Sequence, residues 1–271
     1  MTRDMTLVDR LGFVARSTLF TLRRGQQTRD TSVVVDEYTS GWGQYKDFLR
    51  SAKTLDEWLR IRGIEDVPAY YNVEGKLSFQ AFDSAGYYRK TMLDCVRRRF
   101  PQARSITEFG CGVGRNLLFM KRERPDLDCF GYELCQPGVE VAQAAAQKFG
   151  VEVKYAQLDY VKDAADKYVF PETDIAFTMF SLEQLPRNSE TAVRNILERV
   201  RLGSIHMEPV PENYPRSLRG LLGRIEHRKV DYLSDFDSVV RSLILKDIEF
   251  EKMTSAHNPL MFPSLYILRK G

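Results

Sequence analysis

A glycine-rich segment at residues 108–116 has the residue types and spacing of a ligand-binding turn. Gly110, Gly112 and Gly114 would let the backbone turn sharply and let a ligand approach its amides without a Cβ atom in the way. Glu108 precedes the first glycine, and a carboxylate there would suit a ligand with a positively charged amino-acid head. We therefore expect a ligand pocket at the carboxyl end of the strand before this turn.

A dinucleotide is the first alternative ligand, because its binding fingerprint also consists of a strand, a glycine-rich turn, a helix and a later acid. The spacing argues against it. A dinucleotide turn has the pattern G-x-G-x-x-G, whereas this turn reads G-x-G-x-G followed by Arg115. Glu108 would also be poorly placed beside a pyrophosphate. An NAD-dependent oxidoreductase is therefore the disfavoured reading.

Two further acids follow the next two expected strands. Glu133 lies nineteen residues after Gly114, where a carboxylate can accept hydrogen bonds from both hydroxyls of a ribose. Asp159 follows the third strand and could accept a hydrogen bond from the exocyclic amine of a purine. The alternatives are that Asp159 caps a helix and that Glu133 is a surface acid. Together with the glycine turn, the two acids favour a nucleoside-containing ligand.

The elements that position these residues form a regular pattern from residue 105 onward, in which short strand-like runs alternate with longer helical stretches. This alternation is typical of βα units on a parallel sheet. Strands are expected at 105–109, 127–133, 151–155, 174–179 and 204–207, and helices at 116–123, 139–149 and 189–200. Helices at 216–229 and 234–245 and strands at 248–253 and 264–268 follow, and the short link between the last two strands allows an antiparallel pair at the sheet edge.

Residues 1–103 are expected to form an N-terminal helical extension, and residues 104–271 the ligand-binding domain. The extension has helical patterns at 45–62 and 84–100, joined by a stretch at 68–80 that suggests a short hairpin. No linker rich in Pro, Gly or Ser separates the two parts, so we do not expect a second independent domain. The extension is predicted to cap the carboxyl edge of the sheet and to exclude water.

Three segments resemble motifs of the class I S-adenosylmethionine-dependent methyltransferases. Residues 106–118 resemble motif I, residues 130–134 the second motif, and residues 174–186 the fourth-strand motif, in which a His usually stands at the place of Gln184. The resemblance spans about residues 104–271. It implies an α/β, Rossmann-like sheet of seven strands in the order 3-2-1-4-5-7-6, with S-adenosyl-L-methionine as the cofactor.

The resemblance also implies which residues bind the cofactor. The acid before the turn would lie near the methionine amine, the acid after the second strand would hold the ribose, and residues after the third strand would lie near the adenine. Phe180 and Ser181 would line the cofactor beside the transferred methyl group. The implied cofactor-binding residues are Glu108, Phe109, Gly110, Cys111, Gly112, Gly114, Asn116, Glu133, Leu134, Asp159, Tyr160, Phe180 and Ser181.

Methyl transfer is an in-line displacement, so the chain has to align the acceptor and, for a hydroxyl, remove a proton. His206 and Glu208 lie at the end of the fifth strand and are the candidate catalytic residues, although a His at a strand end is more often structural. Tyr88, Arg89 and His257 are the candidates for binding the acceptor, with burial of the aromatic residues in a helical core as the alternative.

The remaining histidine is not assigned to the reaction. His227 lies among Arg224, Arg228 and Lys229, and this charge pattern predicts a solvated helix face.

The acceptor is expected to be a polar small molecule. Residues 206–210 and 258–263 show a weaker resemblance to bacterial methyltransferases of sugar and polysaccharide gene clusters, which implies a hydroxyl of a sugar or of a lipid-linked glycan precursor. N-methylation of a small metabolite or peptide and a non-catalytic S-adenosylmethionine-binding module are the alternatives. The motif that nucleic-acid amino-methyltransferases carry after the fourth strand is absent, and Asp174 has no partnering acid for Mg²⁺, so we expect no nucleic-acid substrate and no metal.

Composition limits the setting in which this chemistry takes place. The 271 residues carry a formal charge of +3, too mild for a nucleic-acid footprint. Four cysteines without metal-type spacing, no bilayer-spanning run and no signal peptide predict a cytoplasmic protein. Residues 5–24 combine apolar and arginine residues, which predicts a cap or homodimer helix, with contact to a membrane surface as the alternative.

Overall fold

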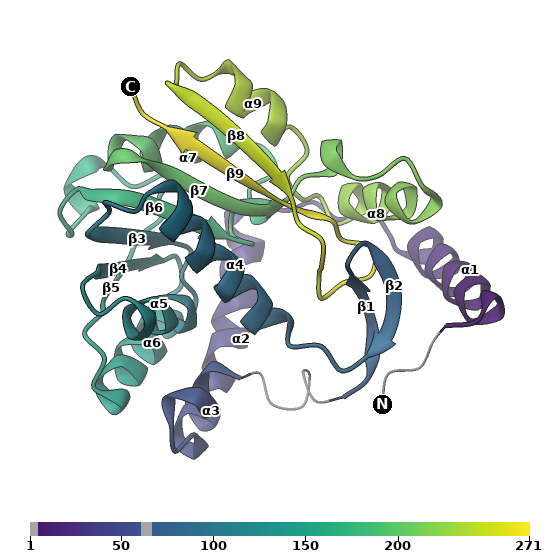
Figure 1. The fold of residues 1–271 in the computed structure, drawn as a ribbon, viewed down its shortest axis with the longest axis horizontal. Coiled ribbons are helices and arrows are strands. Elements are labelled where there is room, and N and C mark those ends of the chain that lie inside the picture. The colour runs from purple at the N-terminus through teal and green to yellow at the C-terminus, as the bar shows by residue number, and fades with distance from the viewer. Residues whose placement is uncertain (1–4, 61–66) are drawn as a thin grey trace.

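The computed structural model describes residues 5–60 and 67–271, which are built around one seven-stranded sheet (Figure 1). The strand order is β5-β4-β3-β6-β7-β9-β8, with β9 antiparallel to both of its neighbours and the other pairs parallel. The strands are β3 (Ser105–Phe109), β4 (Asp128–Glu133), β5 (Lys154–Gln157), β6 (Thr173–Met179), β7 (Val200–Pro209), β8 (Asp247–Lys252) and β9 (Pro263–Arg269). The predicted order 3-2-1-4-5-7-6 is confirmed.

Helices cover both faces of this sheet, so that nearly every residue of its central strands is buried. On one face, Ile106 and Phe177 pack with residues of α4, α5 and α6. On the other face, Ala176 and Tyr266 pack with residues of α7 and α9. The helices of the two layers are α4 (Ser84–Arg99), α5 (Arg115–Glu123), α6 (Gln136–Phe149), α7 (Ser189–Glu198) and α9 (Phe236–Ser242). All of them lie where the sequence pattern predicts helices.

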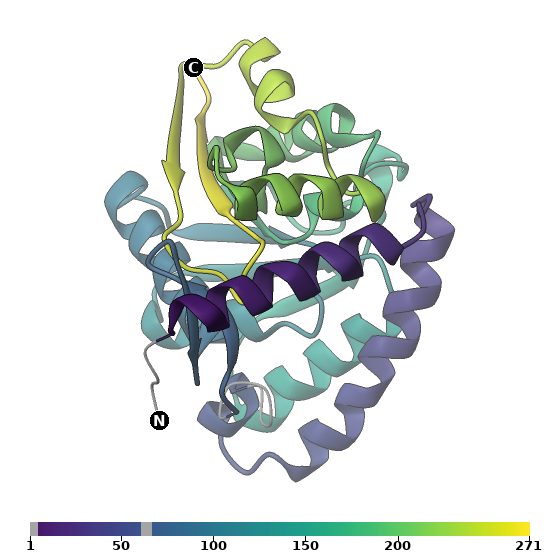
Figure 2. The same ribbon diagram turned by 90° about the vertical axis from the view of Figure 1, so that its right-hand side faces the viewer.

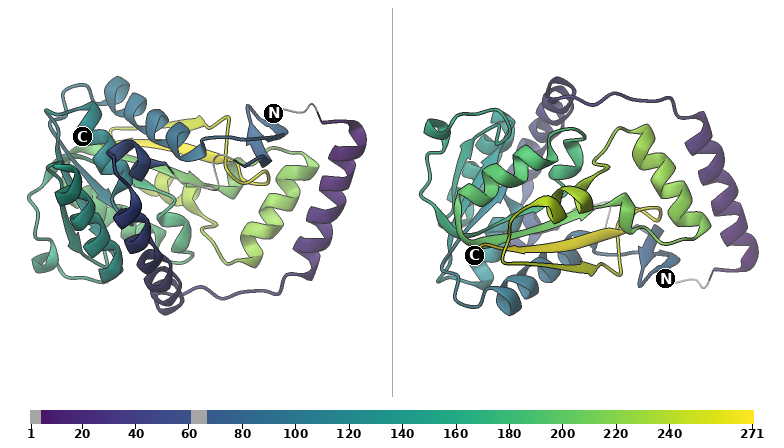
Figure 3. Two further views of the ribbon diagram at one scale, coloured as in Figure 1. Left: turned by 90° about the horizontal axis from the view of Figure 1, so that it is seen from below. Right: turned by 90° about the horizontal axis from the view of Figure 1, so that it is seen from above.

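The N-terminal helix α1 (Leu7–Arg23) lies along α8 (Leu218–Lys229), as Figures 2 and 3 show. Phe13 packs against Leu222 and Leu260 in a small separate cluster. Several large apolar side chains of α1 point outward instead, among them Leu11 and Phe20, which are 61% and 60% exposed. The predicted amphipathic helix is therefore present, and one of its faces docks on α8. No helix among the described residues is long and apolar enough to cross a membrane.

The second helix, α2 (Thr31–Ser51), packs against α6 and is followed by the short α3 (Leu55–Leu59). Asp30 caps α2 by accepting hydrogen bonds from the backbone N–H groups of Ser32 and Val33. The sequence predicts one helix at 45–62. The structure has two helices here instead: α2 begins earlier, and a break at 52–54 separates it from α3. Residues 61–62 lie outside the described part of the chain. Valines at 33–35 and glycines at 41 and 43 lower the helix propensity here, so packing on α6 decides that this segment is helical.

The predicted hairpin is confirmed as β1 (Ala69–Val73) and β2 (Lys76–Gln80). Glu74 and Gly75 form its turn, and both have positive φ. The hairpin also holds the loop that precedes β9: the backbone N–H groups of Asn72 and Gly75 donate to the carbonyl oxygens of Ala256 and Thr254. Residues 5–60 and 67–103 thus contribute helices and this hairpin, and the division at residues 103 and 104 stays a prediction.

Candidate active site

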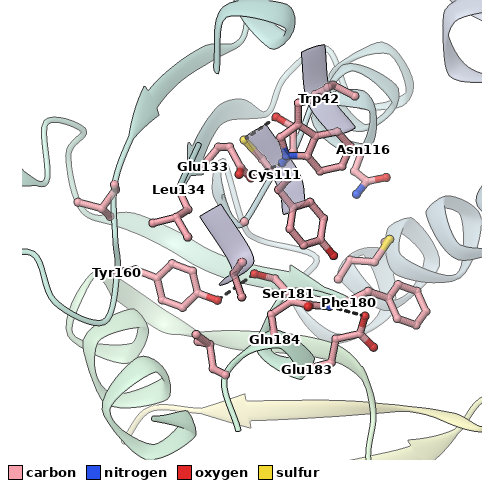
Figure 4. Close-up of a pocket in the computed structure, with 18 of the residues that line it drawn as sticks. Trp42, Cys111, Asn116, Glu133, Leu134, Tyr160, Phe180, Ser181, Glu183 and Gln184 are labelled. Carbon is pink, nitrogen blue, oxygen red and sulfur yellow. Dashed lines mark hydrogen bonds between the residues drawn. The ribbon is translucent and has the colours of Figure 1, made fainter. Parts of the chain in front are cut away.

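A pocket of about 350 Å³ opens at the carboxyl ends of β3, β4 and β6 (Figure 4). In parallel α/β sheets, ligands bind at this edge, where the strand order reverses. Its volume lies at the lower end of the roughly 300–1,000 Å³ found for small-molecule sites. The walls come from the glycine-rich turn, the residues after β4, β5 and β6, one turn of α4, and α2. Helix α2 supplies Thr31, Val34, Tyr38, Trp42 and Tyr45.

The glycine turn has the backbone conformation that its sequence suggests. Gly110, Gly112 and Gly114 have φ values of 74°, 54° and 76°, in the left-handed region that other residues rarely adopt. A Cβ atom on Gly110 would collide with the hydroxyl of Ser181. A Cβ atom on Gly114 would lie 2.6 Å from the hydroxyl of Tyr155. Close approach to neighbouring side chains therefore requires glycine at both places.

Trp42 of α2 lies over this turn, as Figure 4 shows. A Cβ atom on Gly112 would lie 3.0 Å from the Trp42 ring, so the ring is packed against the turn itself. The indole Nε1 of Trp42 is buried and has no hydrogen-bond partner. Sequence reasoning missed this residue, because α2 is far from the turn in sequence. The signal that the sequence offered for Trp42 was its residue type, since the chain has two tryptophans.

Two buried carboxyl groups flank the turn. Glu133 accepts hydrogen bonds from the backbone N–H of Gly112 at 2.8 Å and of Cys135 at 3.1 Å. Burial raises the pKa of Glu133, and these hydrogen bonds lower it. Glu108 is fully buried: its Oε1 accepts from Asn116 at 2.7 Å, its Oε2 has no partner, and burial raises its pKa to about 8. An unpartnered buried carboxyl oxygen is one that a cationic ligand group would satisfy.

Most of the residues predicted to bind the cofactor line this pocket. They are Gly110, Cys111, Gly112, Asn116, Glu133, Leu134, Asp159, Tyr160, Phe180 and Ser181. Glu108, Phe109 and Gly114 are not among the lining residues. Glu108 lies behind Asn116, and the absence of a Cβ on Gly114 makes room for Tyr155 rather than for a ligand. The ring of Phe109 packs against Tyr132 and Tyr160, because neighbouring residues of a strand point to opposite faces.

The turn after β6 forms the floor of the pocket and carries a backbone outlier. Phe180 has a φ of 56°, and its N–H donates to the carbonyl oxygen of Met207 at 3.0 Å. The hydroxyl of Ser181 is 2.8 Å from the hydroxyl of Tyr160. A left-handed non-glycine residue stores strain, and such residues gather at functional sites. The strained turn thus places Ser181 against the glycine turn.

Glu183 and Gln184 follow in the same turn, and both are buried while lining the pocket. The side-chain amide of Gln184 donates to Glu183 Oε1 at 2.9 Å (Figure 4). Glu183 Oε2 is buried without a hydrogen-bond partner. Burial raises the pKa of Glu183 well above its ordinary value. Glu183 was overlooked in the sequence, although it stands within the motif at 174–186.

His206 does not occupy the place predicted for a catalytic base. It is fully buried and does not line the pocket. Its Nδ1 is 3.0 Å from the hydroxyl of Thr178 and its Nε2 is 2.8 Å from the hydroxyl of Ser204. Burial lowers its pKa to about 3. Strand β7 runs to Pro209, beyond the predicted end at 207, so His206 is a hydrogen-bonded residue inside the sheet.

Glu208, the other candidate, also lies behind the pocket. Its Oε1 accepts hydrogen bonds from the backbone N–H groups of Ser181 and Leu182 at 3.2 and 3.1 Å. Its Oε2 accepts from the N–H of Glu183 at 3.2 Å, and burial raises its pKa to about 7. Glu208 therefore positions the turn after β6, and we correct its predicted catalytic role accordingly.

Of the three residues predicted to bind the acceptor, Tyr88 and His257 lie together against Phe180. The Tyr88 ring centroid is 4.8 Å from that of Phe180. The Tyr88 hydroxyl accepts the backbone N–H of His257 at 2.7 Å and lies 3.0 Å from its Nδ1. Arg89 lines the pocket itself. Tyr88 and His257, 169 positions apart in the chain, are thus fixed beside the same ring, and the role of all three residues in acceptor binding stays a prediction.

His227 is not on a solvated helix face, contrary to the sequence prediction. It is buried, its Nε2 lies 2.5 Å from the carbonyl oxygen of Leu233, and burial lowers its pKa to about 4. The charged neighbours in sequence do not determine its direction, since α8 turns this side chain toward the body of the protein.

No group of three or more His, Cys, Asp or Glu side chains within residues 5–60 and 67–271 could hold a metal ion.

Residues 107–206, from β3 to β7, match a protein family described as a methyltransferase domain. This match covers the glycine turn, both flanking acids and the turn after β6. Residues 107–206 belong to a methyltransferase domain. The strand order and the edge at which the pocket opens agree with this assignment.

Solved structures with the same fold are distant in sequence, and no curated protein matches the chain. Magnesium protoporphyrin IX methyltransferase from Synechocystis, solved with bound S-adenosylhomocysteine (SAH), covers 89% of this chain and 100% of its own, at 11% identity and a TM-score of 0.59. An O-methyltransferase family protein from Burkholderia thailandensis covers 68% of this chain and 56% of its own, at 14% identity and a TM-score of 0.52.

A third solved structure is the phosphoethanolamine N-methyltransferase 2 of Haemonchus contortus, in complex with phosphomonomethylethanolamine and SAH. It covers 67% of this chain and 52% of its own, at 14% identity and a TM-score of 0.52. These likenesses concern the fold of the methyltransferase domain. Their named substrates differ widely, from a porphyrin to a phosphorylated amine.

Proposed function

We propose that the chain transfers a methyl group from S-adenosylmethionine to a hydroxyl group of a polar small molecule, such as a sugar or a lipid-linked glycan precursor. The observation that carries the proposal is the convergence of the glycine turn, Asn116 and Glu133 on one pocket within the methyltransferase domain, with Glu108 directly behind Asn116. When bound, S-adenosylmethionine supplies a methyl group on a sulfonium sulfur.

The residues around the pocket fit the parts of this cofactor. The unpartnered Oε2 of Glu108 suits the ammonium of the methionine moiety. The carboxylate of Glu133 suits the ribose hydroxyls, and Leu134, Asp159 and Tyr160 line the end where the adenine would lie. Buried walls also exclude water from the reacting groups, which strengthens the electrostatic interactions among them.

The chemistry of the acceptor is the finer part of the proposal. A hydroxyl acceptor needs a proton acceptor, and Glu183 presents an unpartnered carboxyl oxygen beside the pocket. We propose that no metal takes part. N-methylation is the second candidate, favoured by the same carboxyl group because it could also bind an amine.

The four cysteines are free, which supports the reducing environment of the cytoplasm.

Calorimetry with SAH and with NAD, each titrated into the full chain, tests the proposal. We expect SAH to bind and NAD not to bind. The variant E133A should lose SAH affinity by about tenfold or more, because it removes a carboxylate that accepts charge-assisted hydrogen bonds. Binding of NAD instead of SAH would overturn the proposal. SAH binding without transfer of a tritiated methyl group would favour the non-catalytic module.

A further inference from the structure

A second cavity, of about 190 Å³, lies behind the turn after β6. It is bordered by α8, by the end of α1 and by the loop between β8 and β9, which the β1–β2 hairpin holds in place. Polar side chains predominate in its wall. The lining residues are Arg24, Glu183, Tyr214, Gly223, Glu226, His227, Val230, Tyr232, His257, Asn258, Leu260 and Met261.

Glu183 lines both this cavity and the pocket at the glycine turn. Its side chain is buried, Gln184 occupies one carboxyl oxygen, and the other has no partner. Phe180 and His257 continue the partition between the two spaces, with their ring centroids 5.7 Å apart. One carboxyl group therefore faces the place expected for the methyl donor and also a separate polar space.

The charges around Glu183 come from several elements. Burial and the neighbouring carboxyl of Glu208 raise its pKa, whereas the amide of Gln184 and the guanidinium of Arg29 lower it. Arg29 belongs to the segment before α2, and its guanidinium lies 4.9 Å from the centroid of the Tyr232 ring. Glu183 in turn contributes to the raised pKa values of Tyr38 and Tyr214. The carboxyl group is thus surrounded by groups able to hydrogen bond.

We propose that the second cavity holds the methyl acceptor, a small polyhydroxylated group such as one sugar ring, and that Glu183 accepts the proton of the hydroxyl to be methylated. The inference rests on the proposed function. The cavity is smaller than the roughly 300–1,000 Å³ typical of drug-sized ligands, so it suits one ring or one end group. Its polar wall suits a ligand with many hydroxyls, because buried polar groups need partners.

The step balances without a further reactant. The bond between the methyl carbon and the sulfonium sulfur breaks, and its electron pair stays on the sulfur. A bond forms between the methyl carbon and the acceptor oxygen, and the hydroxyl proton passes to Glu183 and then to water. Accepting the proton requires the ionised form of Glu183, and because burial raises its pKa, this ionised form is a stronger base than an exposed carboxylate.

The experiment uses the full chain, S-adenosylmethionine with a tritiated methyl group, and an extract of the small molecules from the cells that encode the chain. E183Q should lower label transfer by about 100-fold or more, because a positioned proton acceptor contributes about 10²–10⁴-fold. Its affinity for SAH, measured by calorimetry, should stay within about threefold, or 0.7 kcal/mol. E198Q, on an exposed position of α7, is the matched control and should transfer label at the wild-type rate within about twofold.

A second pair of variants probes the cavity rather than the carboxyl group. M261W fills the cavity and should raise the acceptor concentration needed for half-maximal labelling far more than M261L, which keeps the side-chain volume. Normal labelling by E183Q or by M261W would overturn the inference and leave the proposed function standing. A product methylated on nitrogen, identified by mass spectrometry, would overturn the hydroxyl assignment. SAH binding without labelling by the wild type would overturn the proposed function, and the inference with it.

Discussion

Glu208 holds the turn that carries Glu183: its Oε2 accepts a hydrogen bond from the backbone N–H of Glu183 at 3.2 Å. Both side chains are buried, and the charge of Glu208 raises the pKa of Glu183. Two neighbouring carboxyl groups cannot both ionise easily in a buried site. Three backbone N–H donors stabilise the negative charge of Glu208, so the ionised form of Glu183 that accepts a proton forms only at the higher pH that its raised pKa requires.

The variant E208Q tests the role of this carboxylate in positioning the turn. An amide offers one acceptor oxygen instead of two, and its NH₂ group would face a backbone N–H. We expect the free energy of unfolding to fall by about 1–3 kcal/mol and SAH affinity to fall, since Ser181 lines the pocket. Urea unfolding and calorimetry measure the two effects. E198Q should change neither, and an E208Q protein with wild-type SAH affinity would contradict a positioning role.

The pH dependence of SAH binding tests Glu108. Its pKa in the unliganded protein is raised from 4.5 to about 8 by burial, so the carboxyl is mostly neutral at pH 7. An ammonium group beside it favours the charged form, and binding below pH 8 should therefore release a proton. We expect SAH affinity to rise as the pH increases toward 8. Calorimetry in two buffers of different ionisation enthalpy measures the released proton.

The same shift has a consequence for stability, since the folded state keeps a proton that the unfolded chain releases. The contribution of Glu108 to the stability of the unliganded protein is fully present below pH 4.5 and is lost as the pH rises to about 8. E108Q should weaken both the pH dependence of stability and the proton release. Proton release by E108Q equal to that of the wild type would assign the titration to another group.

The left-handed backbone of Phe180 predicts an unusual order of stability for two variants. F180A and F180G both remove the ring, so their difference reports on the backbone alone. We expect F180G to be more stable than F180A by about 1 kcal/mol, because a left-handed residue with a Cβ is strained. In ordinary backbone, glycine is the less stable of the two. Thermal unfolding of both variants would show the opposite order if the turn were unstrained.

Trp42 should report on ligand binding. Its ring lies against Gly112 and lines the pocket, whereas Trp58 is fully buried outside it. We expect SAH to shift the tryptophan emission of the wild type and of W58F, and to have little effect on W42F. A full response in W42F would show that the ligand does not reach the turn below α2.

The sequence by itself determined the central sheet and the glycine turn. Strands such as β3 are short runs that alternate with helical stretches, and the left-handed backbone of Gly110 is a local requirement that glycine meets. The place of Glu133 in the pocket could also be predicted, because the carboxyl ends of parallel strands meet at one edge of the sheet. The sheet, the glycine turn and the place of Glu133 depend on local sequence patterns and on the strand order that those patterns specify.

Only the tertiary structure decided which side chains face the pocket. His206 and Glu208 were misplaced because pairing of β7 with β9 extends the strand to Pro209, and no local signal marks that end. Trp42 reaches the turn through the packing of α2 on α6, against the low helix propensity of its segment. Glu183 borders two cavities because strain at Phe180 and hydrogen bonds donated by the turn to Glu208 fix the turn. Each outcome depends on contacts between residues distant in sequence, which no local pattern records.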